Sequence, residues 1–146
     1  AIRRQRQMCI RDRDIVFTSK ISPRLSRING DSIKLRQLLL NLLRNAKDAV
    51  STAPTEKAAD SCTQPEITLE AYSDTTTLTI QIKDNGCGIE SEQLEHIFEP
   101  FITYKKDGTG LGLAISHRVA KAHHGNLVVS SVPGISTVFT LTLPIQ

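Results

Sequence analysis

The chain has 146 residues, of which 39% are apolar and 23% charged, and a formal net charge of +3. These values are typical of one soluble globular domain with a modest core. No apolar run approaches the length that crosses a bilayer, so we expect no membrane contact by this domain. Cys9, Cys62 and Cys87 fit neither a paired disulfide framework nor a metal-ligand spacing. This favours a reducing, cytoplasmic location, although a longer parent could be anchored in the bacterial inner membrane.

Five arginines lie in the first thirteen residues, where the apolar residues show no periodicity. A basic arm that binds nucleic acid is the alternative interpretation. It is disfavoured because no aromatic residue is interleaved with the arginines and the rest of the chain is nearly neutral. We therefore expect no nucleic-acid partner, a disordered or non-native tail over residues 1–13, and a single domain over residues 14–146.

The domain begins with a predicted strand and a long predicted helix. Weak alternation predicts the strand over residues 14–22, and either Asp31 or Ser32 is placed to cap the helix that follows. Between residues 33 and 50 the apolar residues fall on one side of a helical wheel, which makes this helix the best-determined element.

The rest of the chain alternates between predicted strands and helices. Consecutive strands with mostly antiparallel connections, and helices gathered on one face, indicate an α+β fold. This fold is a two-layer α/β sandwich with a mixed, mainly antiparallel sheet. After a surface loop at 51–65, the predicted elements are strands at 67–71 and 78–82, a short helix at 91–98, a helix from the glycine run at 108–113 to residue 122 that Gly125 is placed to end, and strands at 127–131 and 137–143.

Asn41, Asn45 and Asp48 are spaced i, i+4 and i+7 on the long helix. They therefore share one stripe beside its apolar face. Amide and carboxylate oxygens in such a stripe are suitable ligands for a hard cation such as Mg²⁺. From the spacing alone, a solvated helix edge is the favoured alternative.

A second motif, Asp84-Asn85-Gly86-Cys87-Gly88-Ile89, follows the strand at 78–82. Gly86 and Gly88 permit backbone angles that other residues avoid, and they let a flat ligand approach the backbone closely. Asp84 could accept a hydrogen bond from an exocyclic amine. A functionally silent Asp-Asn-Gly turn explains this motif equally well.

The third motif is Gly108-Thr109-Gly110-Leu111-Gly112-Leu113 at the start of a helix, where free N–H groups favour an anion. It is not a P-loop, because no Gly-Lys-Ser/Thr closes it. It is not a dinucleotide fingerprint either, because Leu113 occupies the third glycine position. A flexible hinge is the alternative.

The order of these motifs resembles the nucleotide-binding (Bergerat) fold of the GHKL superfamily. Asn-Leu-Leu-Arg-Asn-Ala-Lys-Asp-Ala at 41–49 and Phe-Glu-Pro-Phe at 98–101 are similar to the catalytic domain of bacterial sensor histidine kinases of the nitrogen-regulation and dicarboxylate-sensing types. The segment 134–139, ahead of Leu143-Pro144, is also typical of that family. The resemblance extends from residue 14 to the C-terminus.

The resemblance implies that the domain binds ATP and Mg²⁺. Asn45 would ligate the Mg²⁺ that bridges the phosphates, with Asn41 and Asp48 beside it, and Asn41 and Asn45 would be the catalytic residues. Asp84 would bind the adenine amino group. The other residues expected around ATP are Gly86, Gly88, Ile89 and Thr137 near the base, Phe98 and Phe101 as anchors of an ATP lid over 102–109, Lys105 or Lys106 near phosphate, and Gly108, Thr109, Gly110, Leu111, Gly112 and Leu113 in the glycine run.

The residue at position 41 favours kinase over ATPase activity. Chaperone and topoisomerase ATPases of the superfamily carry a Glu one helical turn before the metal-binding Asn, and that Glu polarises the attacking water. Asn41 occupies this position and cannot act as a general base at neutral pH. Transfer to a histidine needs no such base, because neutral imidazole is already a nucleophile.

The chain's own histidines lack the sequence setting of the family's phosphate acceptor. We therefore expect a protein histidine kinase catalytic domain that acts on a histidine-bearing dimerisation domain, separate from or missing in this chain. Through that domain it would serve a response regulator in two-component signal transduction. The isolated domain is expected to be monomeric. The alternative is a nucleotide-binding regulatory module, either a degenerate kinase or an anti-sigma-factor kinase acting on serine.

Overall fold

The computed structural model describes residues 15–51, 64–101 and 111–145. The predicted tail at 1–13 and most of the predicted loop at 51–65 lie outside these ranges. Within the described ranges, none of the helices combines the length and the apolar character needed to span a bilayer.

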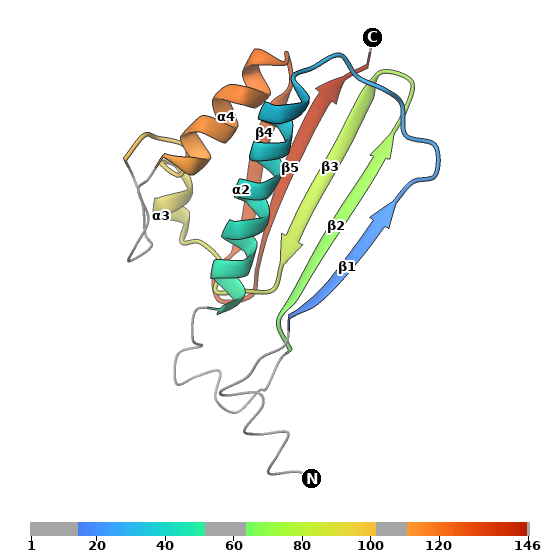
Figure 1. Cartoon of the computed structure of the whole chain (residues 1–146). Helices are drawn as coiled ribbons and strands as arrows, with labels where there is room; N and C mark the ends of the chain where they lie inside the picture. The colour runs from blue at the N-terminus through green and yellow to red at the C-terminus, as the bar shows by residue number, and fades with distance from the viewer. Residues whose placement is uncertain (1–14, 52–63, 102–110, 146) are drawn as a thin grey trace.

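A five-stranded sheet forms one layer of the fold, with the strand order β1-β2-β3-β5-β4 (Figure 1). β1 runs parallel to β2, and the other three pairs are antiparallel. The mixed, mainly antiparallel sheet predicted from the sequence is therefore confirmed. The strands are β1 (Val16–Ile21), β2 (Glu66–Ser73), β3 (Thr77–Asp84), β4 (Asn126–Val132) and β5 (Ser136–Pro144).

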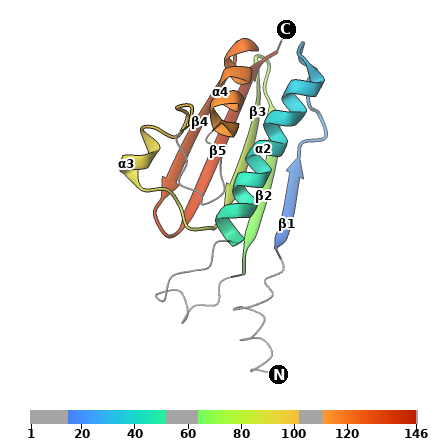
Figure 2. The same ribbon diagram turned by 60° about the vertical axis from the view of Figure 1, so that its left-hand side comes forward.

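The helices α2 (Ser32–Ser51), α3 (Ser91–Leu94) and α4 (Gly112–Ala122) form the second layer. All three lie on the same side of the sheet, and α2 and α4 run in opposite directions next to one another (Figures 1 and 2). This arrangement confirms the predicted two-layer sandwich.

The core lies between α2 and the sheet. Leu38, Leu42, Ala46 and Val50 repeat every four residues on α2 and are all buried. Alternate residues of β5 face them, so that burial repeats every two residues along this strand, at Thr137, Phe139, Leu141 and Leu143. The side chain of Asp31 caps α2, because its Oδ1 accepts hydrogen bonds from the N–H groups of Ile33 (3.0 Å) and Lys34 (3.1 Å).

The predicted helix at 91–98 is shorter in the structure, where α3 ends at Leu94. The hydrogen bonds after Leu94 span only three residues, as from His96 N–H to the Gln93 carbonyl (3.0 Å). Pro100 disfavours helical backbone angles only at Glu99, so it does not explain why α3 ends at Leu94.

The end of α4 also differs from the prediction at Gly125. The left-handed residue that ends the helix is His124, with φ of 61°. Gly125 donates to the carbonyl of Ala120 (2.9 Å) and His124 to that of Lys121 (3.0 Å), which together form a Schellman motif. Glycine is needed at position 125 for another reason, because a Cβ there would collide with the backbone carbonyl of Thr142.

Candidate nucleotide-binding site

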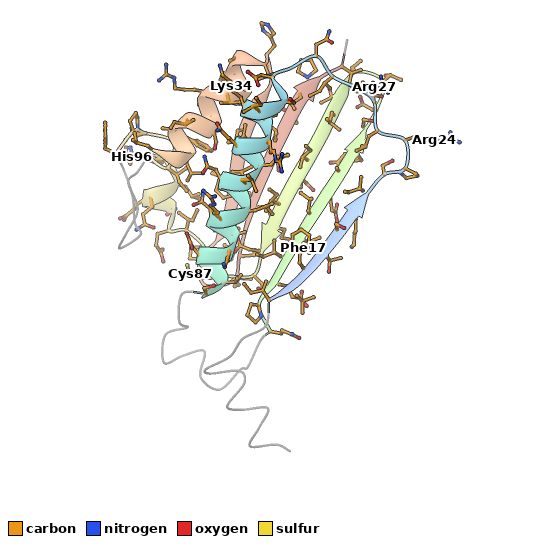
Figure 3. All side chains as sticks on the ribbon, viewed as in Figure 1. Phe17, Arg24, Arg27, Lys34, Cys87 and His96 are labelled. Atoms are coloured by element: carbon orange, nitrogen blue, oxygen red, sulfur yellow. The ribbon has the colours of Figure 1, made fainter. Side chains whose placement is uncertain are left out.

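The Asp84–Ile89 motif follows β3 and lies beside the C-terminal end of α2 and the turn between β4 and β5. Figure 3 places Cys87, in the middle of the Asp84–Ile89 motif, next to the last turn of α2. The N–H of Cys87 donates to the carbonyl of Ala49 on α2 (3.3 Å), and its own carbonyl accepts from the N–H of Gly134 (2.6 Å). The motif is therefore held between a helix and a turn that are distant in sequence.

Gly88 allows this close packing in two ways. Its φ of 71° is a left-handed backbone conformation that side chains disfavour. A Cβ at Gly88 would also collide with the carbonyl of Val132 at the end of β4. Gly86 approaches the backbone of Ala49 in the same manner on the α2 side. Both glycines singled out in the sequence are thus required by the local geometry.

Asp84 is the buried acidic group of the site, with a side chain only 2% exposed. Burial raises the pKa of its carboxyl group to about 6, and the hydrogen bond that Oδ1 accepts from Gly86 N–H (2.9 Å) partly offsets this rise. At neutral pH the group is mainly ionised, although it is hidden from water. A carboxylate in this condition favours a ligand that donates hydrogen bonds to it.

Thr137 is the partner of Asp84 in the β3–β5 register, and it is equally buried. The hydroxyl oxygens of Thr137 and Ser131 are 2.9 Å apart. Ser131 Oγ also contacts the carbonyl of Ser136 (2.7 Å) and the N–H of Ile89 (2.8 Å), so one side chain links β4, β5 and the Asp84–Ile89 motif. Sequence reasoning missed Ser131, because no spacing marks it.

Asn41 and Asn45 are half-buried on α2, and Asp48 is exposed. The Asn41 side-chain amide donates to the carbonyl of Gly112 (3.3 Å) and to Ser116 Oγ (3.4 Å). Ser116, which sequence reasoning also missed, is fully buried and donates to the same Gly112 carbonyl (2.9 Å). Asn41 therefore joins the predicted metal stripe to the start of α4.

The donor set of this stripe consists of amide and carboxylate oxygens, which are the ligand types that Mg²⁺ accepts when phosphate oxygens complete its shell. In the described part of the chain, no group of three or more His, Cys, Asp or Glu side chains could hold a metal ion by itself.

Phe98 and Phe101 lie in different environments. The ring of Phe98 is half-buried and stacks on His117 of α4, with centroids 4.8 Å apart and planes at 25°. Phe101 is 75% exposed and has a φ of 66°. Leu111 is the N-cap residue of α4 and makes no side-chain cap hydrogen bond, and Gly112 and Leu113 are the first residues of the helix. The other predicted residues of this region lie outside the described residues, namely the lid at 102–109, Lys105, Lys106, Gly108, Thr109 and Gly110.

A family model described as "Histidine kinase-, DNA gyrase B-, and HSP90-like ATPase" matches residues 30–146. The signal transduction histidine-protein kinase AtoS of Escherichia coli K12 is 44% identical, over 89% of this chain and 20% of AtoS. The sensor histidine kinase ZraS of Salmonella typhi is 40% identical, over 91% of this chain and 26% of ZraS. The chain thus spans about a quarter or less of the length of these curated relatives.

Solved structures resemble the chain over almost its whole length. The mycobacterial sensor histidine kinase MprB superposes with a TM-score of 0.74 at 28% identity, over 98% of this chain and 91% of that one. Full-length ShkA in complex with AMPPNP superposes with a TM-score of 0.73 at 26% identity, over 98% of this chain and 29% of that one. The chain therefore belongs to the family of histidine kinase-, DNA gyrase B- and HSP90-like ATPases, and its fold is that of the catalytic domains of histidine kinases.

Proposed function

We propose that the domain binds Mg-ATP at this site and transfers the γ-phosphoryl group to a histidine on a dimerisation domain, in two-component signal transduction. The observation that carries the proposal is the buried Asp84 carboxylate at the end of β3, on the same side of the sheet as the asparagine stripe of α2. This arrangement offers an acceptor for a base at one end and oxygen ligands for a cation at the other.

At the base end, Asp84 accepts a hydrogen bond from the exocyclic amine of adenine. The close approach of Gly86 to α2 and of Gly88 to the β4–β5 turn fixes the backbone around that carboxylate. A charge-assisted hydrogen bond in a buried position contributes about 1.5–3 kcal/mol. The complex of ShkA with AMPPNP supports this assignment, since AMPPNP carries the same base as ATP.

At the phosphate end, the first turn of α4 supplies backbone N–H groups. The N-cap residue Leu111 makes no side-chain cap hydrogen bond, and a helix N-terminus with its dipole favours an anion. Asn45 and Asn41 would supply oxygens to Mg²⁺, and the bound ion would neutralise charge on the phosphates. Since the Asn41 amide nitrogen donates to Gly112, its Oδ1 is the atom left for the cation.

The acceptor is a histidine rather than water because position 41 provides no general base. In the transfer, an imidazole nitrogen bonds to the γ-phosphorus, the bond from that phosphorus to the bridging oxygen breaks, and ADP leaves. The imidazole proton passes to solvent. Positioning and charge neutralisation supply most of the rate in such reactions, which suits a site with no base.

The proposed setting is supported by the relatives, which are named as sensor or signal transduction histidine kinases. The domain works in the cytoplasm as part of a longer kinase, in which the dimerisation domain passes phosphate to a response regulator. By itself the domain is a monomer that contacts neither nucleic acid nor the membrane.

The test is incubation of the chain with Mg²⁺ and ATP labelled at the γ-phosphate, together with a separately made histidine-bearing domain of a related kinase. The expected product is label on that domain, sensitive to acid and stable to base, as phosphohistidine is. Replacement of the acceptor histidine by alanine should abolish it. Acid-stable label would point to serine phosphorylation. ATP binding without transfer to any acceptor domain would favour a regulatory module.

A further inference from the structure

The hydroxyl of Ser131 has three polar neighbours at hydrogen-bonding distance. Ser131 Oγ lies 2.8 Å from the backbone nitrogen of Ile89, 2.7 Å from the carbonyl oxygen of Ser136 and 2.9 Å from Thr137 Oγ1. A serine hydroxyl has one proton to donate and two lone pairs to accept with. The three contacts use that capacity in full.

The direction of each hydrogen bond follows from the groups involved. The carbonyl of Ser136 can only accept, so the single proton of Ser131 is directed to it. The backbone N–H of Ile89 can only donate, so it occupies one lone pair. Thr137 must then donate its own proton to Ser131, because Ser131 has no second proton to give.

The consequence for Thr137 is that its hydroxyl proton is committed within the protein. Its oxygen can then only accept a hydrogen bond from a ligand. Thr137 lies opposite Asp84 in the β3–β5 register, and both side chains are 2% exposed. Asp84 as a carboxylate is also an acceptor. Together they form an acceptor pair that offers no donor to the ligand.

We propose that Ser131 is a positioning residue that sets base specificity, because it takes the Thr137 proton and so makes the Asp84–Thr137 end of the proposed site complementary to a 6-amino purine. The inference rests on the proposed function, since it requires Asp84 and Thr137 to face the base. A 6-oxo purine places an acceptor where adenine places its amine. Its O6 acceptor would therefore face the buried acceptors of Asp84 and Thr137. This arrangement costs far more binding free energy than the loss of one hydrogen bond.

The test compares Mg-ATP with Mg-ITP, whose bases differ in the 6-substituent and in the protonation of the adjacent ring nitrogen. Calorimetry of the whole chain should show a clear preference for ATP. In Ser131→Ala the Thr137 hydroxyl is free to turn its proton toward the ligand. The ratio of ATP to ITP affinity is then expected to fall by about tenfold, the scale of one neutral hydrogen bond. Ser131→Thr, which keeps the hydroxyl, should restore the ratio.

Ser130→Ala is the matched control, because Ser130 is the preceding residue of β4 and is directed to the opposite face of the sheet. It should leave the ratio unchanged. An equal loss of affinity for both nucleotides in Ser131→Ala overturns the proposal, because it would show that Ser131 only supports the Ile89 backbone. If Ser131→Ala does not fold, Thr137→Val removes the same hydroxyl acceptor. It must then lower the ratio of ATP to ITP affinity. Failure of the unaltered chain to bind either nucleotide refutes the proposed function instead.

Discussion

The side-chain amide of Asn41 donates a hydrogen bond to the backbone carbonyl of Gly112 over 3.3 Å, and so ties the middle of α2 to the first residue of α4. The same amide nitrogen also reaches Ser116 Oγ. A residue expected only from its place in a metal-binding stripe thus has a structural contact as well, which positions the oxygen that the proposed cation site uses.

Asn41→Ala should therefore affect both stability and phosphotransfer. Loss of the contacts to Gly112 and Ser116 is expected to lower the free energy of unfolding by about 1–2 kcal/mol. Urea unfolding measures this change. Gln37→Ala, at an exposed amide one turn earlier on α2, is the control and should change stability by less than about 0.5 kcal/mol. An Asn41→Ala domain as stable and as active as the unaltered one would contradict the assignment.

Ser116 and Asn41 should be energetically coupled. The Ser116 hydroxyl donates to the Gly112 carbonyl and accepts from Asn41, in a fully buried position. In a double-mutant cycle with Asn41→Ala and Ser116→Ala, the two losses of stability should not add, with an interaction energy of about 0.5 kcal/mol or more. Simple additivity would mean that the two side chains act independently.

Asp84 should make the stability of the ligand-free domain depend on pH. Its pKa is raised from the ordinary value of 3.8 to about 6 in the folded chain, so between these values the folded domain holds a proton that the unfolded chain has lost. The free energy of unfolding therefore falls as pH rises from about 4 to about 6, by up to about 3 kcal/mol for this group.

Urea unfolding of the unaltered domain and of Asp84→Asn at several pH values isolates this contribution. The Asp84→Asn domain should lack the decrease, and at pH 7 it should be at least as stable as the unaltered domain because it buries no charge. Identical pH profiles for the two proteins would exclude Asp84 as the source. The Mg-ATP affinity should show the opposite pH dependence to the stability. It should weaken below about pH 6, because Asp84 takes up a proton there.

His124→Gly should stabilise the domain. His124 has a φ of 61°, a conformation that costs an L-residue about 1–2 kcal/mol and costs glycine little. After the greater chain entropy of glycine is subtracted, a gain of up to about 1 kcal/mol remains. Thermal unfolding should show a higher midpoint. Lys121→Gly, inside the last turn of α4, should lower it by contrast. A lower midpoint for His124→Gly would mean that its imidazole makes a stabilising contact that exceeds the backbone cost.

The sequence predicted the elements whose apolar residues repeat regularly, and it failed where the contacts join distant segments. The four-residue repeat from Leu38 to Val50 on α2 and the alternation along β5 lie within single elements, so their periodicity is visible in the sequence. Ser116 and Ser131 carry no local signal. Their roles depend on Asn41 and Ile89, which only the tertiary fold brings to them.

Two predicted helix ends, those of α3 and α4, differ in the structure. Gly125 was expected to take the left-handed position that ends α4, because glycine most often does so. The structure uses His124 there, since Gly125 is committed to a close approach to the Thr142 backbone on β5. After α3 ends at Leu94, the chain continues in three-residue turns and buries Ile97 in the core, a contact that the local sequence does not mark.

The central claim, that this domain binds ATP through the buried Asp84 carboxylate, is tested most directly by calorimetric titration with Mg-ATP of the unaltered chain, of Asp84→Asn and of Asp74→Asn. Asp74 is an exposed residue in the turn before β3, at the opposite end of that strand from Asp84. We predict that the unaltered chain and Asp74→Asn bind one Mg-ATP with the same affinity, whereas Asp84→Asn folds but shows no binding. Retention of tight Mg-ATP binding by a folded Asp84→Asn domain would contradict the claim.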